Sequence, residues 1–321
     1  MEDNNWMVYV NCMTYNHAPY VTDALNGFCM QQTTFPFVCG VIDDASTDGE
    51  PEVIRHYLEE HFDLDDESVV RRDETDDYER IFARHKENRN CYFVVVWLKY
   101  NHYSTRKAKR PYVSEWRDIA KYLAVCEGDD YWIVPNKLQM QVDFLEEHPD
   151  HSMCIHAYRC DIFRGDNIIS KINHKYDKNI NIVPPKDVIA NKRMFCATAS
   201  KMIRTKSLID YPEWALKASS VGDKQQKLVL FARGHIAYID KVMCVYRLGV
   251  AGSWTDRTSV DRDYLRCTRD DLLQINKDFD VWTNRKYHNL VRQANLRLIW
   301  SFIKTDIKSF IYKIKTTPRS K

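Results

Sequence analysis

Short β-rich runs alternate with helical stretches through the first half of the chain, and this alternation limits the fold more than any other feature. Residues 7–13, 37–42 and 92–98 are typical of strands, and residues 19–31 and about 51–60 are typical of helices. The run at 92–98 is apolar throughout, as in a central strand that is buried on both faces. The pattern predicts an α/β fold with a mostly parallel, Rossmann-like central sheet flanked by helices.

The rest of the chain is less regular. A strand is predicted at 121–126, followed by a helix at 135–147 with a proline in its first turn and an apolar stripe. The acidic stretch at 63–79 is expected to form a solvated face. Residues from about 261 onward contain few turn residues and are expected to form a helical extension. Further elements are predicted as strands near 153–158, 195–203 and 236–246 and as a helix at 223–233.

Composition excludes some classes of protein. The net charge is +2, whereas a nucleic-acid binder usually has a basic excess, so no nucleic-acid partner is expected. No apolar stretch approaches the roughly 18–20 residues that span a bilayer. The ten cysteines are scattered without a Cys-x-x-Cys pair or a secretory signal, which indicates buried thiols in a reducing compartment. We therefore expect a cytoplasmic protein that is at most attached to a membrane surface.

Polar clusters follow three of the predicted strands. They are Thr14 and Tyr15, then Asp43, Asp44 and Ser46, and then Glu127, Gly128, Asp129 and Asp130. Because ligands of an open parallel sheet gather beyond the carboxyl ends of its strands, we expect one pocket there. Its carboxylates would suit a hard divalent cation such as Mg²⁺ or Mn²⁺, which in turn binds phosphates. The alternative is a set of helix caps and turn residues on a non-catalytic fold.

Four stretches of the chain carry a family likeness. They are residues 13–17, 41–49, 126–132 with the following 135–138, and 221–223. Taken together and in this order they resemble the motifs of the family 2 glycosyltransferases, which have the A-type glycosyltransferase fold.

The likeness covers approximately residues 7–255. It implies a catalytic domain at 1–255, with a nucleotide-sugar-binding half at 1–132 and an acceptor-binding half at 133–255. The helical extension is then residues 256–321.

The resemblance implies a pocket for the nucleotide base. Thr14, Tyr15 and Asp44 would line it, and the Asp44 carboxylate would accept a hydrogen bond from a pyrimidine ring N–H. Asp43 and Ser46 would support this loop. The expected donor is therefore a UDP-sugar.

The resemblance also implies a metal site, because Glu127, Gly128 and Asp129 occupy the place of the family's Asp-x-Asp motif. Asp129 would be the principal ligand of Mn²⁺ or Mg²⁺. Glu127 would meet the ribose or the ion through water, and Asp130 would lie near the donor sugar.

Asp223 falls where the family places its general base. The implied reaction is an inverting displacement, in which Asp223 takes the proton of the acceptor hydroxyl while the metal stabilises the departing diphosphate. A glycan or lipid-linked glycan in surface polysaccharide synthesis is the expected acceptor. Asp223 also opens a predicted helix with Gln226 at capping-box spacing, so a structural role is the alternative. For the whole chain, the alternative is a sugar-nucleotide-binding or scaffolding relative without turnover.

The chain departs from the family pattern at Gly249. Many relatives have a histidine just after the Tyr-Arg pair of the late strand, and here Gly249 follows closely after Tyr246 and Arg247. The third protein contact of the metal is thus left open, and His235 is favoured as a structural residue at a strand edge. The basic run at 106–110 would either reach the diphosphate or form a solvated loop.

Two further groups of residues have alternative interpretations. A possible zinc site has irregular spacing, and its side chains are favoured as buried groups on one strand face: His148, His151, Cys154, His156 and Cys160. The tail at 296–321 combines apolar residues with Lys304, Lys308, Lys313, Lys315 and Arg319. This pattern is typical of a basic amphipathic helix, which would lie on an anionic membrane surface or pack on the catalytic domain.

Overall fold

The computed structural model describes residues 6–165, 167–174, 176, 181–190, 196–217, 219, 221–250 and 262–316, with side chains described outside 262–265 and 304–316. The chain divides into two compact units. We call them the sheet unit (Met1–Ile182, Cys196–Ile209 and Arg233–Arg257) and the helical unit (Val183–Phe195, Asp210–Ala232 and Thr258–Lys321). The predicted domain boundaries at 132 and 255 stay predictions.

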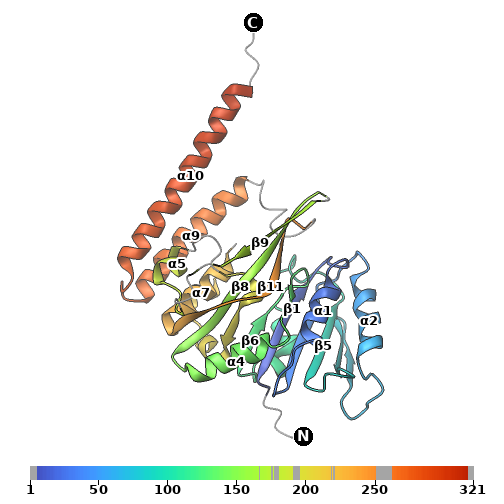
Figure 1. Cartoon of the computed structure of the whole chain (residues 1–321). Helices are drawn as coiled ribbons and strands as arrows, with labels where there is room; N and C mark the ends of the chain where they lie inside the picture. Colours follow the sequence, from blue (N-terminus) through green and yellow to red (C-terminus); the bar gives the residue numbers. More distant parts are fainter. Residues whose placement is uncertain are drawn as a thin grey trace. The chain divides into compact units, whose positions relative to one another are not determined.

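The described strands form one sheet in the order β3-β4-β5-β2-β1-β6-β10-β8-β11-β7, with β9 paired to β8. Figure 1 shows this sheet and labels some of its strands, among them β1, β5 and β8. Its centre consists of four parallel strands, β5 (Cys91–Leu98), β2 (Phe37–Asp43), β1 (Val8–Thr14) and β6 (Tyr122–Val125). β2 is buried along its whole length, as expected of a strand covered on both faces.

Strands of mixed direction, joined largely by antiparallel pairs, complete both sides of this centre. On one side lie β3 (Arg71–Glu74) and β4 (Tyr78–Arg84). On the other side lie β10 (Met202–Arg204), β8 (His151–Arg164), β9 (Asn167–Asn173), β11 (His235–Leu248) and β7 (Tyr131–Trp132). β8 and β11 are parallel to each other. The α/β prediction is confirmed, but the sheet is mixed, because short connections such as those joining β3, β4 and β5 permit only antiparallel pairing.

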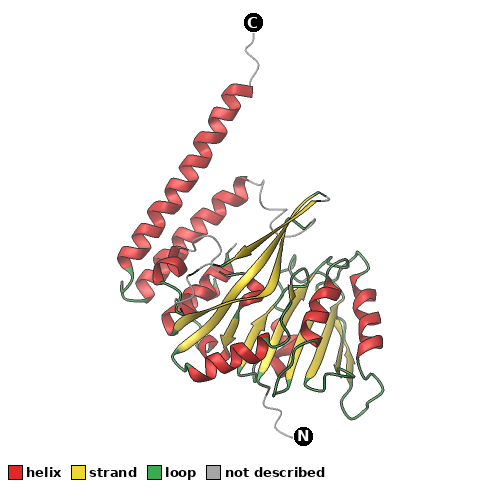
Figure 2. Cartoon of the chain, viewed as in Figure 1, coloured by secondary structure: helices red, strands yellow, loops and turns green. Residues whose placement is uncertain are grey.

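Helices cover the sheet, as Figure 2 shows. They include α1 (Val21–Cys29), α2 (Glu50–His61) and α4 (Lys137–Glu147), and the shorter η1 (Arg110–Val113), α3 (Ser114–Arg117), η2 (Thr198–Ser200) and η3 (Thr205–Leu208). In α1 the buried residues recur at helical spacing, with Val21, Leu25 and Phe28 among them. Phe28 packs against the ring of Trp132 at 4.9 Å between centroids, which joins α1 to β7.

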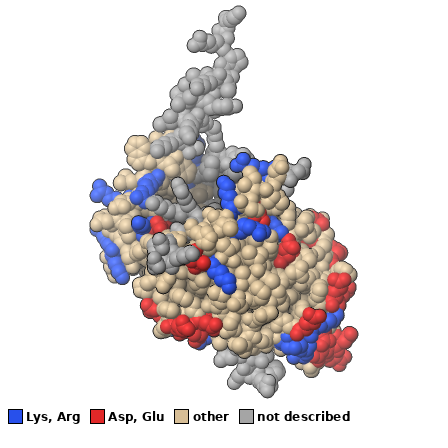
Figure 3. Space-filling view, in the orientation of Figure 1, with Lys and Arg blue, Asp and Glu red and all other residues tan. Residues whose placement is uncertain are grey.

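The acidic stretch at 63–79 contains β3 and the start of β4. Every residue of β3 is exposed or partly exposed, which agrees with the expected solvated face. The strand itself was not predicted, because a charged edge strand lacks the apolar alternation that reveals a strand. On the face drawn in Figure 3, acidic and basic groups are interspersed around a broad uncharged surface, in line with the balanced composition.

The helical unit contains α5 (Pro185–Ala190), α6 (Glu213–Leu216), α7 (Gly222–Arg233), α9 (Arg262–Trp282) and α10 (His288–Thr316). Its core includes Leu228 of α7, Phe279 of α9 and Val291 of α10. The predicted helical extension is confirmed. Within the described residues, no helix is both long and apolar enough to span a membrane.

Candidate functional site

The register of the parallel strands brings the predicted polar clusters together. Thr14, the last residue of β1, lies opposite Asp43, the last residue of β2. The backbone N–H of Asp44 donates to the carbonyl of Thr14 at 3.0 Å, and that of Gly128 donates to the carbonyl of Met13 at 3.0 Å. The loops after β1, β2 and β6 therefore meet at one edge of the sheet, where an open α/β sheet binds its ligands.

Gly128 permits the close approach of the acidic turn to β1. A Cβ atom at this position would lie 2.1 Å from Thr14 Oγ1 and 2.6 Å from Thr14 Cβ. No larger residue fits without a shift of one of the two segments. Gly128 thus sets the distance between the acidic turn and Thr14, and its predicted role in donor binding stays a prediction.

Glu50, which the sequence analysis did not select, joins two of the three loops. It is fully buried in the first turn of α2, directly after Gly49, whose φ is 89°. Its carboxylate accepts hydrogen bonds from the Thr14 hydroxyl, from Ser46 Oγ at 2.8 Å and from the backbone N–H of His17 at 3.0 Å. The sequence signal was ambiguous, since an acidic residue in a first helical turn is also explained by the helix dipole.

His17 links Thr14 to the acidic turn. Its Nδ1 lies 3.2 Å from Thr14 Oγ1, and its Nε2 lies 3.8 Å from Asp129 Oδ2. The side chains of His17 and Asp129 are 14% and 15% exposed. The pair is therefore largely enclosed but still accessible to a small ligand.

The residues of the acidic turn differ in exposure. Glu127 is exposed, Asp129 is partly exposed and Asp130 is fully buried. Burial raises the pKa of Asp130 well above its ordinary value, and the charges of Asp129 and Glu127 raise it further. The predicted contact of Asp130 with a sugar stays a prediction, and in this structure its side chain is inaccessible.

Arg247 supports the acidic turn from β11. Its backbone N–H donates to Asp130 Oδ1 at 2.9 Å, and its Nη1 donates to the carbonyl of Asp129 at 3.0 Å. The guanidinium lies over the ring of Tyr131, 4.4 Å from the centroid. The positive charge of Arg247 thus lies next to the acidic turn, where it offsets part of the negative charge of the carboxylates.

The four carboxylates of this region also act on Cys12, a buried residue of β1. Burial raises the pKa of the Cys12 thiol well above its ordinary value, and the charges of Glu50, Glu127, Asp129 and Asp130 raise it further. Carboxyl groups from the second and third loops thus lie near the end of β1.

Asp43 and Asp44 have different environments. Burial raises the pKa of Asp43 to about 6, although the backbone N–H of Ser46 donates to both of its carboxylate oxygens at 3.3 Å. Asp44 accepts from the backbone N–H of His102 at 2.8 Å and of Tyr103 at 3.1 Å. Its Oδ2 also lies 2.8 Å from Lys109 Nζ, so one residue of the basic run at 106–110 lies at the predicted base pocket. Tyr15, the remaining residue of the predicted base pocket, is partly exposed.

Asp223 belongs to the helical unit, where it lies in the first turn of α7. Its carboxylate is 55% exposed, and its Oδ2 lies 2.6 Å from Lys227 Nζ one turn later. Lys224, its neighbour, points inward and donates to the carbonyl of Val188 at 3.0 Å. The general-base role of Asp223 stays a prediction.

No group of three or more His, Cys, Asp or Glu side chains among the described residues is placed to hold a metal. The residues of the alternative zinc site have other partners. His148 Nδ1 lies 2.8 Å from the carbonyl of Phe144, and His156 Nδ1 lies 2.7 Å from that of Ala157. His235, at the start of β11, lies 3.7 Å from Asp150.

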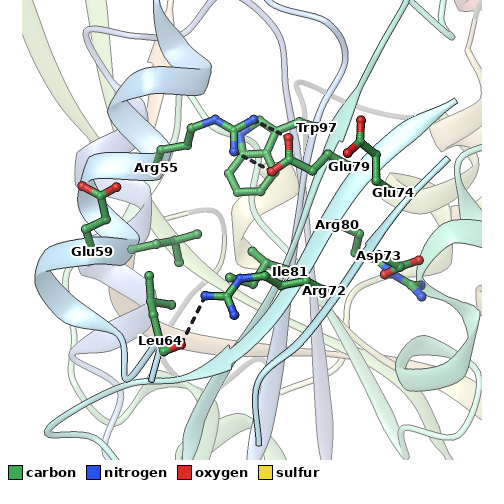
Figure 4. A pocket seen from close by; sticks show the side chains of 11 residues that line it. Arg55, Glu59, Leu64, Arg72, Asp73, Glu74, Glu79, Arg80, Ile81 and Trp97 are labelled. Carbon is green, nitrogen blue, oxygen red and sulfur yellow. Dashed lines mark hydrogen bonds and ion pairs between the residues drawn. The ribbon is translucent and has the colours of Figure 1, made fainter. Parts of the chain in front are cut away.

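A separate cavity of about 420 Å³ lies between α2 and strands β3, β4 and β5 (Figure 4). Arg55 lies over the ring of Trp97, 4.1 Å from the centroid, and donates to both carboxylate oxygens of Glu79 at 2.7 and 2.8 Å. None of the predicted site residues lines this cavity.

Solved structures that the chain matches include glycosyltransferases. TarS of S. aureus in complex with UDP-GlcNAc is 17% identical, with a TM-score of 0.49, over 85% of this chain and 65% of that chain. The mannosyltransferase PcManGT from Pyrobaculum calidifontis, in complex with GDP-Man and Mn²⁺, is 14% identical, with a TM-score of 0.48, over 94% and 75%. At these scores, the fold assignment rests on the strand order and register of this chain rather than on the alignments.

Relatives by sequence are uncharacterized proteins of Mycobacterium bovis and Mycobacterium tuberculosis. Each is 29% identical to the chain over 259 residues, which cover 76% of this chain and 61% of the relative. The chain thus spans less than two thirds of the length of these curated relatives. No family model matches the chain.

Proposed function

We propose that this chain is an inverting glycosyltransferase, which moves a sugar from a UDP-sugar to a glycan or lipid-linked glycan acceptor in surface polysaccharide synthesis. The observation that carries the proposal is the meeting of three polar loops at the carboxyl edge of β1, β2 and β6. There, Asp129 is partly exposed next to His17, and Asp44 lies at the end of β2. An edge of this kind binds phosphorylated ligands in open α/β sheets.

A divalent cation, Mn²⁺ or Mg²⁺, fits the chemistry of the acidic turn. Asp129 offers a carboxylate that is accessible from solvent, and the neighbouring Asp130 has a buried oxygen, Oδ2, without a hydrogen-bond partner among the described residues. Asp129 would hold the ion, and Glu127 would contact it through water. The bound ion would neutralise charge on the departing diphosphate.

The remaining roles are proposed for four further residues. Thr14, Tyr15 and Asp44 would bind the base. Because Lys109 forms an ion pair with Asp44, its side chain would have to move away or keep this contact while the base binds. Asp223 would accept the proton of the attacking acceptor hydroxyl. Its exposure leaves the carboxylate accessible to an acceptor.

A screen of donors tests the proposal. We expect Mn²⁺-dependent release of UDP from a UDP-sugar by the full chain, and loss of metal-dependent donor binding in Asp129→Ala. Asp223→Asn should retain donor binding while turnover falls by at least 100-fold, in the range typical of general-base removal.

Three outcomes would contradict parts of the proposal. A response to GDP-sugars alone would overturn the base assignment. Full turnover in Asp223→Asn would remove that residue from catalysis. Tight binding of UDP and Mn²⁺ without transfer or hydrolysis of any sugar would favour a binding or scaffolding protein.

We further propose that α10 contacts an anionic membrane surface, as suits an enzyme that elongates a lipid-linked glycan. Leu296, Ile299, Trp300 and Ile303 recur at helical spacing and are 40–60% exposed. Residues 285–321 contain ten Lys and Arg and one Asp, although the whole chain has a net charge of only +2. The lysines from Lys304 onward and Arg319 lie outside the described side chains.

Flotation with vesicles tests this contact. The full chain should float with vesicles that contain phosphatidylglycerol and not with neutral phosphatidylcholine vesicles, and Trp300→Ser with Ile303→Ser should abolish flotation. Absence of flotation with either vesicle would favour a helix whose lysines simply face water.

A further inference from the structure

The chain Glu50–Thr14–His17 has a defined direction of hydrogen bonding. Glu50 is fully buried, and its two carboxyl oxygens accept three hydrogen bonds. One of these bonds comes from the Thr14 hydroxyl, which has a single proton to donate. Thr14 Oγ1 can therefore act only as an acceptor toward its other neighbour.

That other neighbour is Nδ1 of His17, at 3.2 Å. Since Thr14 Oγ1 accepts, Nδ1 is the donor of this hydrogen bond, and Nε2 is the ring nitrogen that remains to bind a ligand. Nε2 faces Asp129 Oδ2 at a distance of 3.8 Å. Nε2 and Oδ2 thus face each other in a largely enclosed place, and both are atoms that a divalent cation can bind.

We propose that His17 Nε2 and the Asp129 carboxylate together bind the divalent cation. This inference rests on the proposed function and supplies the protein ligand that is missing at Gly249. Adjacent ligands of an octahedral ion at about 2.1 Å are about 3 Å apart, so a small closure of the 3.8 Å separation is sufficient.

The surrounding residues hold the imidazole in place for this role. Glu50 orients Thr14, and Thr14 in turn orients His17, which is the second layer of hydrogen bonds typical of metal-bound histidines. The backbone N–H of His17 also donates to Glu50 at 3.0 Å, so the ring and its backbone are anchored to the same carboxylate. An imidazole ligand favours Mn²⁺ over Mg²⁺, which prefers oxygen.

Binding of Mn²⁺ to the full chain in the presence of UDP tests the inference, with pulsed electron paramagnetic resonance as the readout. We expect the bound ion to show nitrogen hyperfine coupling from a directly bound imidazole. His17→Gln should remove this coupling and weaken Mn²⁺ binding at least tenfold, and Thr14→Val should weaken it roughly 10- to 100-fold by releasing the ring. His235→Gln, which alters an exposed histidine of the same unit, is the matched control and should change neither.

The outcomes separate this inference from the proposed function. Binding of Mn²⁺ that depends on Asp129 but shows no nitrogen coupling would overturn the role of His17 and leave the transferase proposal intact. Nitrogen coupling without any sugar transfer would support the metal site and contradict the transferase. Failure of the wild-type chain to bind Mn²⁺ with or without UDP would overturn the inference.

Discussion

Substitution of Gly128 by alanine tests the close approach on which the site depends. The new Cβ would lie 2.1 Å from Thr14 Oγ1, well inside ordinary contact, so one of the two segments must move by more than an ångström. Such overpacking costs about 1–3 kcal/mol. If Thr14 rotates away instead, the buried Glu50 loses a donor, which costs about 1–3 kcal/mol as well.

We therefore expect Gly128→Ala to lower the free energy of unfolding by about 2 kcal/mol in urea denaturation, in the middle of the range that either response gives. Binding of Mn²⁺ with UDP, measured by calorimetry, should weaken in the folded variant, because Thr14, His17 and Asp129 are displaced together. Gly222→Ala is the matched control for stability, since its Cβ would meet nothing nearer than Gln225 Oε1 at 3.8 Å. If Gly128→Ala unfolds like the wild type and binds equally well, the acidic turn does not approach Thr14 in solution.

Two further predictions concern Asp43 and Asp44, at the end of β2 and in the loop that follows it. Asp43 has a pKa of about 6 against an ordinary value of 3.8. The protonated carboxyl therefore stabilises the fold below about pH 4, and this stabilisation is lost as the pH rises through about 6. Relative to Asp43→Asn, the wild type should lose up to about 3 kcal/mol of unfolding free energy across this window, and a difference that does not vary with pH would refute the shift. Lys109→Met should strengthen UDP binding roughly fivefold, because about 1 kcal/mol of ion pairing with Asp44 no longer competes with the base. Weaker UDP binding in this variant would instead assign Lys109 to the diphosphate.

Several features of the protein were accessible from the sequence because they are local. The apolar run at 92–98 predicted β5, and the change from apolar residues to carboxylates located the ends of β2 and β6. The turn at 127–130 was identified as an acidic run that follows a predicted strand and matches a family motif. Patterns of this kind depend only on residues that are neighbours along the chain, so they can be recognised without the tertiary structure.

The tertiary structure decided which side chains meet across long sequence separations. Glu50 contacts Thr14 only because β1 and β2 pair in register, and Lys109 reaches Asp44 from a loop that follows β5. His17 is one polar residue among many in the sequence, and its position 3.8 Å from Asp129 depends on the parallel pairing of β1 with β6.

The pairing directions of the outer strands and the assembly of the helical unit from separate segments were likewise not encoded in any local pattern. The sequence thus determined the chemical groups at the edge of the sheet. The register of the strands decided their partners, because contacts between distant segments depend on how the whole sheet pairs and packs.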